Sequence, residues 1–243
     1  MRNLIEGLVL PQFARSTQPD GTPHRPPHDS AVLDLGGGQR LAFTTDSYVV
    51  HPWRFPGGDI GKLAVCGTVN DLAMAGAAPR YLSCGLILEE GLPFDTLRQV
   101  IASMQQAAEE AGVQIVTGDT KVVDRGKGDG LYINTSGIGR VRPGIDVGPG
   151  RARPGDVLLV SGPVGDHGIA VMFAREQFGL SGNLQSDSAS VLPLARAAWH
   201  LPGIKFMRDP TRGGLATVSH EIARATGHNL VLQQASVPVR EEV

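Results

Sequence analysis

Four short acidic motifs carry the residue types that could do chemistry. Thr44-Thr-Asp46-Ser47 ends an apolar stretch, and Asn70-Asp71 interrupts an apolar helical pattern. Gly118-Asp-Thr-Lys121 follows a second apolar stretch, and Asp209-Pro-Thr-Arg-Gly-Gly214 precedes a helical one. Mg²⁺ prefers carboxylate and phosphate oxygens as ligands. Together the four motifs predict a nucleotide held through Mg²⁺ ions.

The Asn70-Asp71 pair is the strongest of these signals. An unpaired polar group inside an apolar face costs about 1–3 kcal/mol, and a charge costs more, so a bound metal or ligand is the usual compensation. The alternative is an aspartate satisfied by local hydrogen bonds in its own helix. For Asp46 the alternative is a turn-forming aspartate.

The other two motifs also have ordinary structural interpretations. A glycine, a carboxylate, a hydroxyl and an amine within residues 118–121 suit a magnesium–phosphate group, but they also suit a turn. Asp209 at a helix cap with Pro210 at the first helical position would be common start signals. Those signals do not explain Arg212-Gly-Gly214. Glycines there let a phosphate approach the amides, helped by the helix dipole and the guanidinium.

The elements that must position these motifs indicate a mixed α/β fold. We expect strands over Leu41–Val50, Tyr81–Leu88, the buried segment Val113–Val116, and Leu131–Val141. We expect helices over 59–76 and 95–111, capped by Asp59 and Asp95 and, for the second, ended by Gly112. Residues 11–30, with five prolines, predict an irregular arm.

The stretch Arg142–Gly155 contains three prolines and four glycines, which is typical of a domain linker. It separates a unit at 1–145 from an incomplete one at 150–243. In the second unit we expect a strand at Val157–Val160 and a final strand that begins with Leu230–Leu232. We also expect helices near 167–178, 189–199 and 211–226.

Composition excludes several classes of protein. The formal net charge of −2 gives no reason to expect a nucleic-acid surface. No run of about 18 apolar residues and no basic-then-apolar leader occurs, so we expect a soluble cytoplasmic protein without membrane contact. Cys66 and Cys84 have no C-x-x-C or histidine partner, and we expect ordinary buried thiols.

In combination, these motifs resemble those of HypE, a family of hydrogenase maturation proteins. The matching segments are Thr45-Asp-Ser-Tyr48, Phe55-Pro-Gly-Gly58, Ile60-Gly-Lys62, Asn70-Asp-Leu72, Arg80-Tyr-Leu-Ser-Cys-Gly85, Gly118-Asp-Thr-Lys-Val-Val123, Gly165-Asp-His-Gly168, and Asp209 with Thr211-Arg-Gly-Gly214. The resemblance runs from about Leu41 onward. It implies the two-domain α/β (α+β) fold of aminoimidazole ribonucleotide synthetase, selenophosphate synthetase and thiamine-monophosphate kinase. In that fold the strands of the N-terminal domain, which binds ATP, form a β-barrel across a dimer.

The resemblance also implies a site. Asp46, Asp71 and Asp209 would contact Mg²⁺, with Asp29 as a further candidate. Asp119 and Lys121 would face the phosphates of ATP. The implied catalytic residues are Asp71, Asp119 and Lys121, and the implied nucleotide-binding residues are Asn70, Gly118, Thr120, Arg212, Gly213 and Gly214.

The implied reaction is the ATP-dependent dehydration of a carboxamide on the protein's own C-terminal cysteine, which is a carbamoyl dehydratase activity. The product thiocyanate supplies the cyanide ligands of nickel–iron hydrogenase. The implied partners are a second copy of the chain, the carbamoyltransferase HypF and the scaffold HypC–HypD.

Two segments of the family pattern do not occur in this sequence, namely the glycine-rich N-terminal stretch and the C-terminal segment with the acceptor cysteine. We therefore expect a truncated C-terminal domain, and neither Cys66 nor Cys84 replaces a mobile terminal thiol, because both lie in predicted core elements. Two alternatives stay open. One is another ATP-dependent synthetase or kinase of the same superfamily, and the other is a non-catalytic dimeric module that binds a partner.

Overall fold

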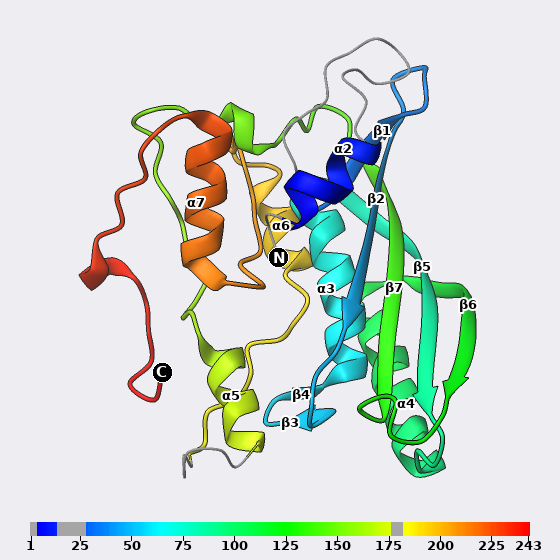
Figure 1. Ribbon diagram of the computed structural model, residues 1–243. Helices are drawn as coiled ribbons and strands as arrows, with labels where there is room; N and C mark the ends of the chain where they lie inside the picture. The colour runs from blue at the N-terminus through cyan, green and yellow to red at the C-terminus, as the bar shows by residue number, and fades with distance from the viewer. Residues whose placement is uncertain (1–3, 14–27, 176–181) are drawn as a thin grey trace.

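A five-stranded sheet forms the core of the chain (Figure 1). The computed structural model describes residues 4–13, 28–175 and 182–243. The strand order is β1-β2-β7-β5-β6, in which β5 and β6 are parallel and the other neighbours are antiparallel. The strands are β1 (Ala31–Asp34), β2 (Arg40–Tyr48), β5 (Ala77–Glu89), β6 (Gln114–Val123) and β7 (Leu131–Val141). The mixed α/β prediction is confirmed, and most of the predicted arm at 11–30 lies outside the described residues.

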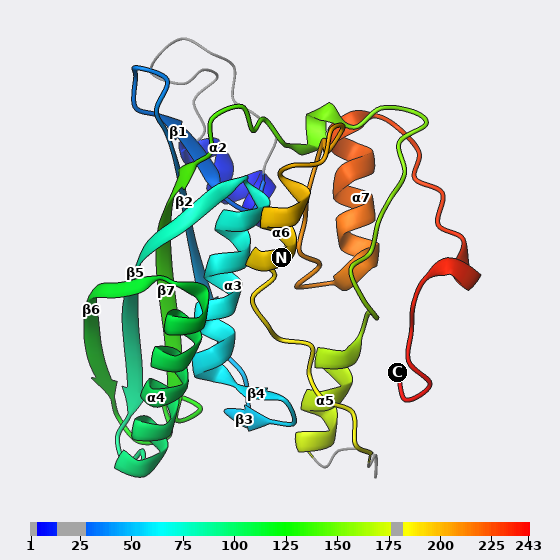
Figure 2. The same ribbon diagram turned by 180° about the vertical axis from the view of Figure 1, so that it is seen from behind.

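Helix α3 (Ile60–Met74) packs on one face of this sheet, as the views in Figures 1 and 2 agree. It follows a two-stranded ribbon of β3 (Arg54–Phe55) and β4 (Gly58–Asp59). Asp59 caps it as predicted, because its Oδ1 accepts hydrogen bonds from the amides of Gly61 at 2.8 Å and Lys62 at 3.0 Å. The helix is apolar on most sides because it lies between the sheet and two further helices, α4 and α6.

Helix α4 (Phe94–Ala111) covers the same face of the sheet (Figure 2). It ends at Gly112, which has a φ of 69°, as predicted. The prediction that Asp95 caps it is wrong. Pro93 is the cap residue, and the Asp95 carboxylate instead accepts a hydrogen bond from Arg98 in the first turn.

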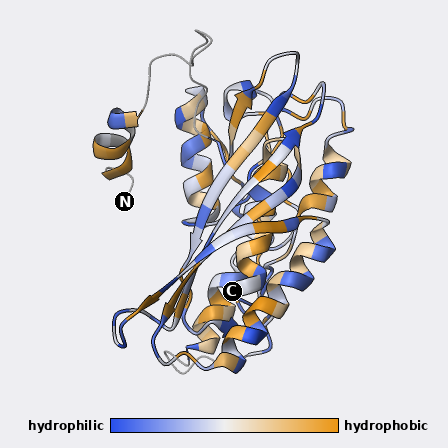
Figure 3. Ribbon diagram, turned by 90° about the vertical axis from the view of Figure 1, so that its right-hand side faces the viewer, coloured by the Kyte–Doolittle hydropathy of each residue, from blue (hydrophilic) through white to orange (hydrophobic). Residues whose placement is uncertain are grey.

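The opposite face of the sheet is exposed within the described chain. Alternate residues of β7 are buried, as in a strand that is covered on one side. The hydropathy colouring in Figure 3 shows apolar stretches along these strands. The strand predicted at Val113–Val116 corresponds to the start of β6, but its predicted burial is wrong, because β6 is an edge strand. Val116 on it is 56% exposed.

The remaining helices lie on the far side of α3 from the sheet (Figures 1 and 2). They are α5 (Asp166–Ala174), α6 (Leu192–Ala198) and α7 (Gly214–Thr226), and shorter helical turns are η1 (Ile5–Val9), α2 (Leu10–Phe13), η2 (Pro149–Arg151) and η4 (Gln234–Ser236). No helix in the described residues combines the length and apolarity that a membrane crossing needs.

The strands predicted at Val157–Val160 and Leu230–Leu232 are absent from the described structure. Val157 and Val231 are both 82% exposed, and Leu159 is 85% exposed. An apolar segment forms a stable strand only when neighbouring strands satisfy its backbone groups. The described chain places no strand beside either segment.

Candidate functional site

Three of the predicted metal ligands meet in space. Asp29, Asp71 and Asp209 each offer a carboxylate oxygen, and these oxygens all lie within 4.8 Å of one another. Asp71 is on α3, Asp29 precedes β1, and Asp209 precedes α7. Asp46 on β2 is not part of this group, but its charge raises the pKa of Asp71 and of Asp209. We call Asp29, Asp71 and Asp209 the aspartate cluster.

Thr44 on β2 contacts two members of the cluster. Its hydroxyl donates to Asp71 Oδ2 at 2.7 Å and also lies 3.0 Å from the backbone carbonyl oxygen of Asp29. Thr44 is 6% exposed, so these contacts are made away from bulk water. The threonine in the Thr44-Thr-Asp46 motif therefore has a defined role beside the carboxylates.

The cluster is electrostatically unfavourable without a cation. Burial, together with the charge of Asp209, raises the pKa of Asp71 to about 7. Burial is also the main cause that raises the pKa values of Asp29 and Asp209. Within the described chain, Asp29 Oδ2 and Asp209 Oδ1 are buried without a hydrogen-bond partner. Unpaired carboxylate oxygens that face one another fit a hard divalent cation such as Mg²⁺.

Arg208 is a charged neighbour that the sequence analysis missed. Its guanidinium contacts Asp29 Oδ1 through Nη1, and its Nη2 lies 2.9 Å from Glu221 Oε2 on α7. The only sequence signal for it was its position directly before Asp209.

The Asn70 side chain does not share the environment of Asp71. Its Nδ2 donates to the carbonyl oxygen of Ala189 at 3.0 Å, and its Oδ1 accepts from the amide of Val191 at 2.8 Å. The two bonds join α3 to the segment that leads into α6. This segment is not helical, and the helix predicted from 189 begins only at Leu192.

The Gly118-Asp-Thr-Lys121 motif lies within strand β6 at the edge of the sheet. Gly118 is opposite Cys84 of β5, where a Cβ atom would lie 2.1 Å from the Cys84 carbonyl oxygen. Lys121 Nζ lies 2.7 Å from Asp119 Oδ2, and hydrogen bonding from Lys121 lowers the pKa of Asp119. Asp119, Thr120 and Lys121 are exposed, and none belongs to the aspartate cluster.

The start of α7 differs from the prediction. The helix begins at Gly214 after Gly213, so Asp209 is not its cap and Pro210 is not its first residue. Gly213 has a φ of 78°, and a Cβ atom there would lie 2.0 Å from Thr217 Oγ1. Only glycine fits this backbone. Arg212 beside it is exposed.

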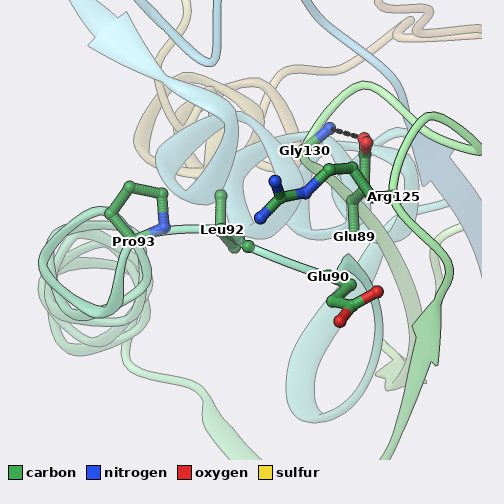
Figure 4. A pocket seen from close by; sticks show the side chains of 7 residues that line it. Glu89, Glu90, Leu92, Pro93, Arg125 and Gly130 are labelled. Atoms are coloured by element: carbon green, nitrogen blue, oxygen red, sulfur yellow. Dashed lines mark hydrogen bonds between the residues drawn. The ribbon is translucent and has the colours of Figure 1, made fainter.

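A separate pocket of about 310 Å³ opens beyond the ends of β5 and β6 (Figure 4). Its lining includes Glu89, Glu90 and Arg125. The Glu89 carboxylate accepts hydrogen bonds from the amides of Gly126 at 2.5 Å and Gly130 at 3.0 Å, so it stabilises the loop that precedes β7. None of the predicted site residues lines this pocket.

The fold and the cluster define the class of protein. Residues 27–141 match the family "AIR synthase related protein, N-terminal domain", and residues 153–243 match the corresponding C-terminal domain family. An AMPPCP- and TMP-bound ThiL structure is 17% identical with a TM-score of 0.74, which supports the fold alone.

Higher similarities point to one branch of this class. Carbamoyl dehydratase HypE of Escherichia coli (strain K12) is 51% identical over 247 residues, which cover 100% of this chain and 72% of that protein. HypE of Rhodobacter capsulatus is 50% identical over 244 residues, covering 100% and 70%. This chain belongs to the carbamoyl dehydratase HypE family.

Solved structures of HypE proteins are also similar to this chain. A HypE–HypF complex matches with a TM-score of 0.90 and 46% identity, covering 99% of this chain and 76% of that one. HypE in complex with ATP matches with a TM-score of 0.80 and 49% identity, covering 99% and 70%.

Proposed function

We propose that this chain is a HypE-type maturation factor for nickel–iron hydrogenase. It takes part in the ATP-dependent dehydration of a protein-bound S-carboxamide to thiocyanate, which provides the cyanide ligands of the iron. About half of the residues are identical to those of carbamoyl dehydratases over the whole chain, which supports this assignment. The observation that carries the proposal is the aspartate cluster, in which two buried carboxylate oxygens have no hydrogen-bond partner in the described chain.

Asp29, Asp71 and Asp209 would hold Mg²⁺, while Asp46 lies outside the cluster and adds negative charge near it. Bound Mg²⁺ would supply positive charge beside the phosphates of ATP. Gly213 and Gly214 open the N-terminal end of α7 to a phosphate group, where the helix dipole and Arg212 favour negative charge. Thr44 orients Asp71 for this role through its 2.7 Å hydrogen bond.

The edge strand β6 contributes the second group of residues. Gly118 allows close pairing with β5, and Thr120 lies between Asp119 and Lys121. Asp119 holds the Lys121 ammonium in place, and we assign Lys121 to the transferred phosphate. Phosphorylation of the carboxamide oxygen would turn a poor leaving group into a good one, and a fixed ammonium offsets the developing negative charge.

The proposed assembly is a homodimer in the cytoplasm, with units at 1–145 and 150–243. The exposed face of the sheet carries apolar side chains that a second copy would cover, completing a barrel. HypF is a proposed partner because a related HypE has been solved in a complex with HypF. HypC–HypD stays a proposed partner from the family resemblance.

Titration calorimetry of ATP into the purified chain, with and without Mg²⁺, tests this function. We expect binding that requires Mg²⁺. Binding of equal strength without the cation would contradict the metal assignment, and no binding in either condition would contradict the proposed nucleotide site.

A further inference from the structure

Arg208 lies between two acidic residues that belong to different parts of the fold. Its Nη1 contacts Asp29 Oδ1 ahead of β1, and its Nη2 lies 2.9 Å from Glu221 Oε2 in the middle of α7. The exposed fractions of the three side chains are 5% for Asp29, 23% for Arg208 and 38% for Glu221. The bridge therefore runs from the buried cluster outward to the helix.

The two ends of the bridge lead to the two halves of the proposed site. Asp29 is a member of the aspartate cluster. Glu221 is in the same helix as Gly214, seven residues after this first residue of α7, which corresponds to about 10 Å along the helix axis. A helix moves as a rigid element, so holding Glu221 also fixes where the N-terminal end of α7 lies.

We propose that Arg208 is a positioning residue that couples the aspartate cluster to the phosphate-binding end of α7, by holding Asp29 with one guanidinium nitrogen and Glu221 with the other. The inference rests on the proposed nucleotide function. It adds a structural connection between the proposed cation site at the aspartate cluster and the proposed phosphate site at the N-terminal end of α7. A cation at the cluster fixes Asp29, Arg208 transmits that position to Glu221, and α7 is held ready for the nucleotide. By linkage, bound nucleotide then raises the affinity for the cation by the same factor.

The chemistry of the side chain supports this role. The guanidinium presents several donors in a rigid plane and can bind two carboxylates at once, whereas a lysine ammonium is a compact charge on a flexible stem. Arg208 also offsets one of the three negative charges of the cluster.

The experiment separates coupling from simple stabilisation. Mn²⁺ affinity is measured by electron paramagnetic resonance, with and without a saturating non-hydrolysable ATP analogue, for the original chain and for Glu221→Gln. This substitution keeps the contact between Arg208 and Asp29 and leaves the cluster intact. We expect Glu221→Gln to bind Mn²⁺ alone within twofold of the original affinity, while the enhancement by nucleotide falls at least fivefold.

Two further variants sharpen the test. Arg208→Lys keeps the positive charge but not the planar guanidinium that binds two carboxylates at once. We therefore expect it to lose the increase in Mn²⁺ affinity caused by nucleotide, as Glu221→Gln does. Glu241→Gln removes an exposed carboxylate far along the chain from this bridge and should keep the full enhancement.

The outcomes distinguish the inference from the function beneath it. If nucleotide does not change Mn²⁺ affinity in the original chain, the proposed function is contradicted. If it does, and Glu221→Gln retains the full enhancement, the function stands and the coupling role of Arg208 is overturned. Equal weakening of Mn²⁺ binding with and without nucleotide would also overturn that role, because Arg208 would then act on the cluster alone.

Discussion

The backbone amide of Val191 donates a 2.8 Å hydrogen bond to the side-chain Oδ1 of Asn70. The bond connects the central helix α3 to the segment that begins α6, and a second bond from Asn70 Nδ2 to Ala189 accompanies it. Asn70 is 8% exposed, so water does not readily replace these partners. The residue next to the proposed metal ligand Asp71 therefore attaches two parts of the fold to each other.

Asn70→Asp should destabilise the protein by about 1–3 kcal/mol, because an oxygen would replace the donor that faces the Ala189 carbonyl. Urea unfolding measures the change in the free energy of unfolding. Asn183→Asp makes the same chemical change at an exposed position and should have little effect. Equal stability of the two variants would contradict the role of Asn70 as an attachment point.

Asp71→Asn should abolish Mg²⁺-dependent nucleotide binding with little loss of folded structure. The amide keeps the size of the side chain and can still accept the hydrogen bond from Thr44, but it removes one charged ligand. Calorimetry and circular dichroism check binding and folding on the same sample. The metal assignment would not survive undiminished Mg²⁺-dependent binding by this variant.

The cation-free protein should lose stability as the pH rises from about 4 to about 7. The pKa of Asp71 is raised from its ordinary value of 3.8 to about 7 in the folded state, so the folded protein favours the protonated carboxyl. That contribution is complete below the unfolded pKa and is lost as the pH rises through the folded value. Melting temperatures across this range, with a chelator present, measure the effect.

Asp71→Asn should weaken this pH dependence but not remove it, because burial also raises the pKa values of Asp29 and Asp209, whereas Asp95→Asn, at an exposed carboxylate, should leave it unchanged. Added Mg²⁺ should raise the melting temperature of the original chain more at pH 8 than at pH 5. An equal rise at both values would argue against ionised carboxylates as the ligands.

Light scattering at micromolar concentration should report a dimer. Phe43 is 42% exposed on β2, and Phe43→Asp should produce a monomer by placing a charge on the apolar sheet face. Val231→Asp changes a side chain that is 82% exposed outside the sheet and should remain dimeric. A monomeric original chain would reject the proposed barrel.

Gly118→Ala should destabilise the pairing of β5 with β6 by about 1–3 kcal/mol, because its Cβ atom would lie 2.1 Å from the Cys84 carbonyl oxygen. Gly85→Ala on the neighbouring strand is the matched control, since its nearest contact would be an ordinary 3.7 Å. Thermal unfolding compares the two. A smaller loss for Gly118→Ala than for Gly85→Ala would show that strand pairing does not require this glycine.

Local signals in the sequence predicted much of the fold. The cap at Asp59, the glycine that ends α4, and the span Leu131–Val141 of β7 all depend on neighbouring residues and agree with the structure. The segments Val113–Val116 and Val157–Val160 were predicted less well. Their apolar composition indicates burial or pairing, but the structure of each depends on what lies beside it, which the local pattern does not contain.

Some residues of the candidate site could likewise be predicted from the sequence, and others could not. The motifs selected Asp71 and Asp209, and the family resemblance added Asp29; these three meet in space, whereas the selected Asp46 lies outside the cluster. Asn70 was assigned together with Asp71 because neighbours in sequence look like one motif, but side chains of consecutive helical residues point about 100° apart. Arg208 was missed because neither partner is adjacent to it in the sequence: Asp29 is far away, and Glu221 is 13 residues further along the chain.

The raised pKa of Asp71 has a consequence for calorimetry itself. Near neutral pH a substantial fraction of this carboxyl carries a proton before any cation binds, since its pKa is about 7. A divalent ligand must expel that proton into the buffer, so the measured heat contains the ionisation enthalpy of the buffer. Titrations in phosphate and in Tris would then differ in apparent enthalpy, and the slope of that difference counts the hydrogen ions that each bound cation displaces.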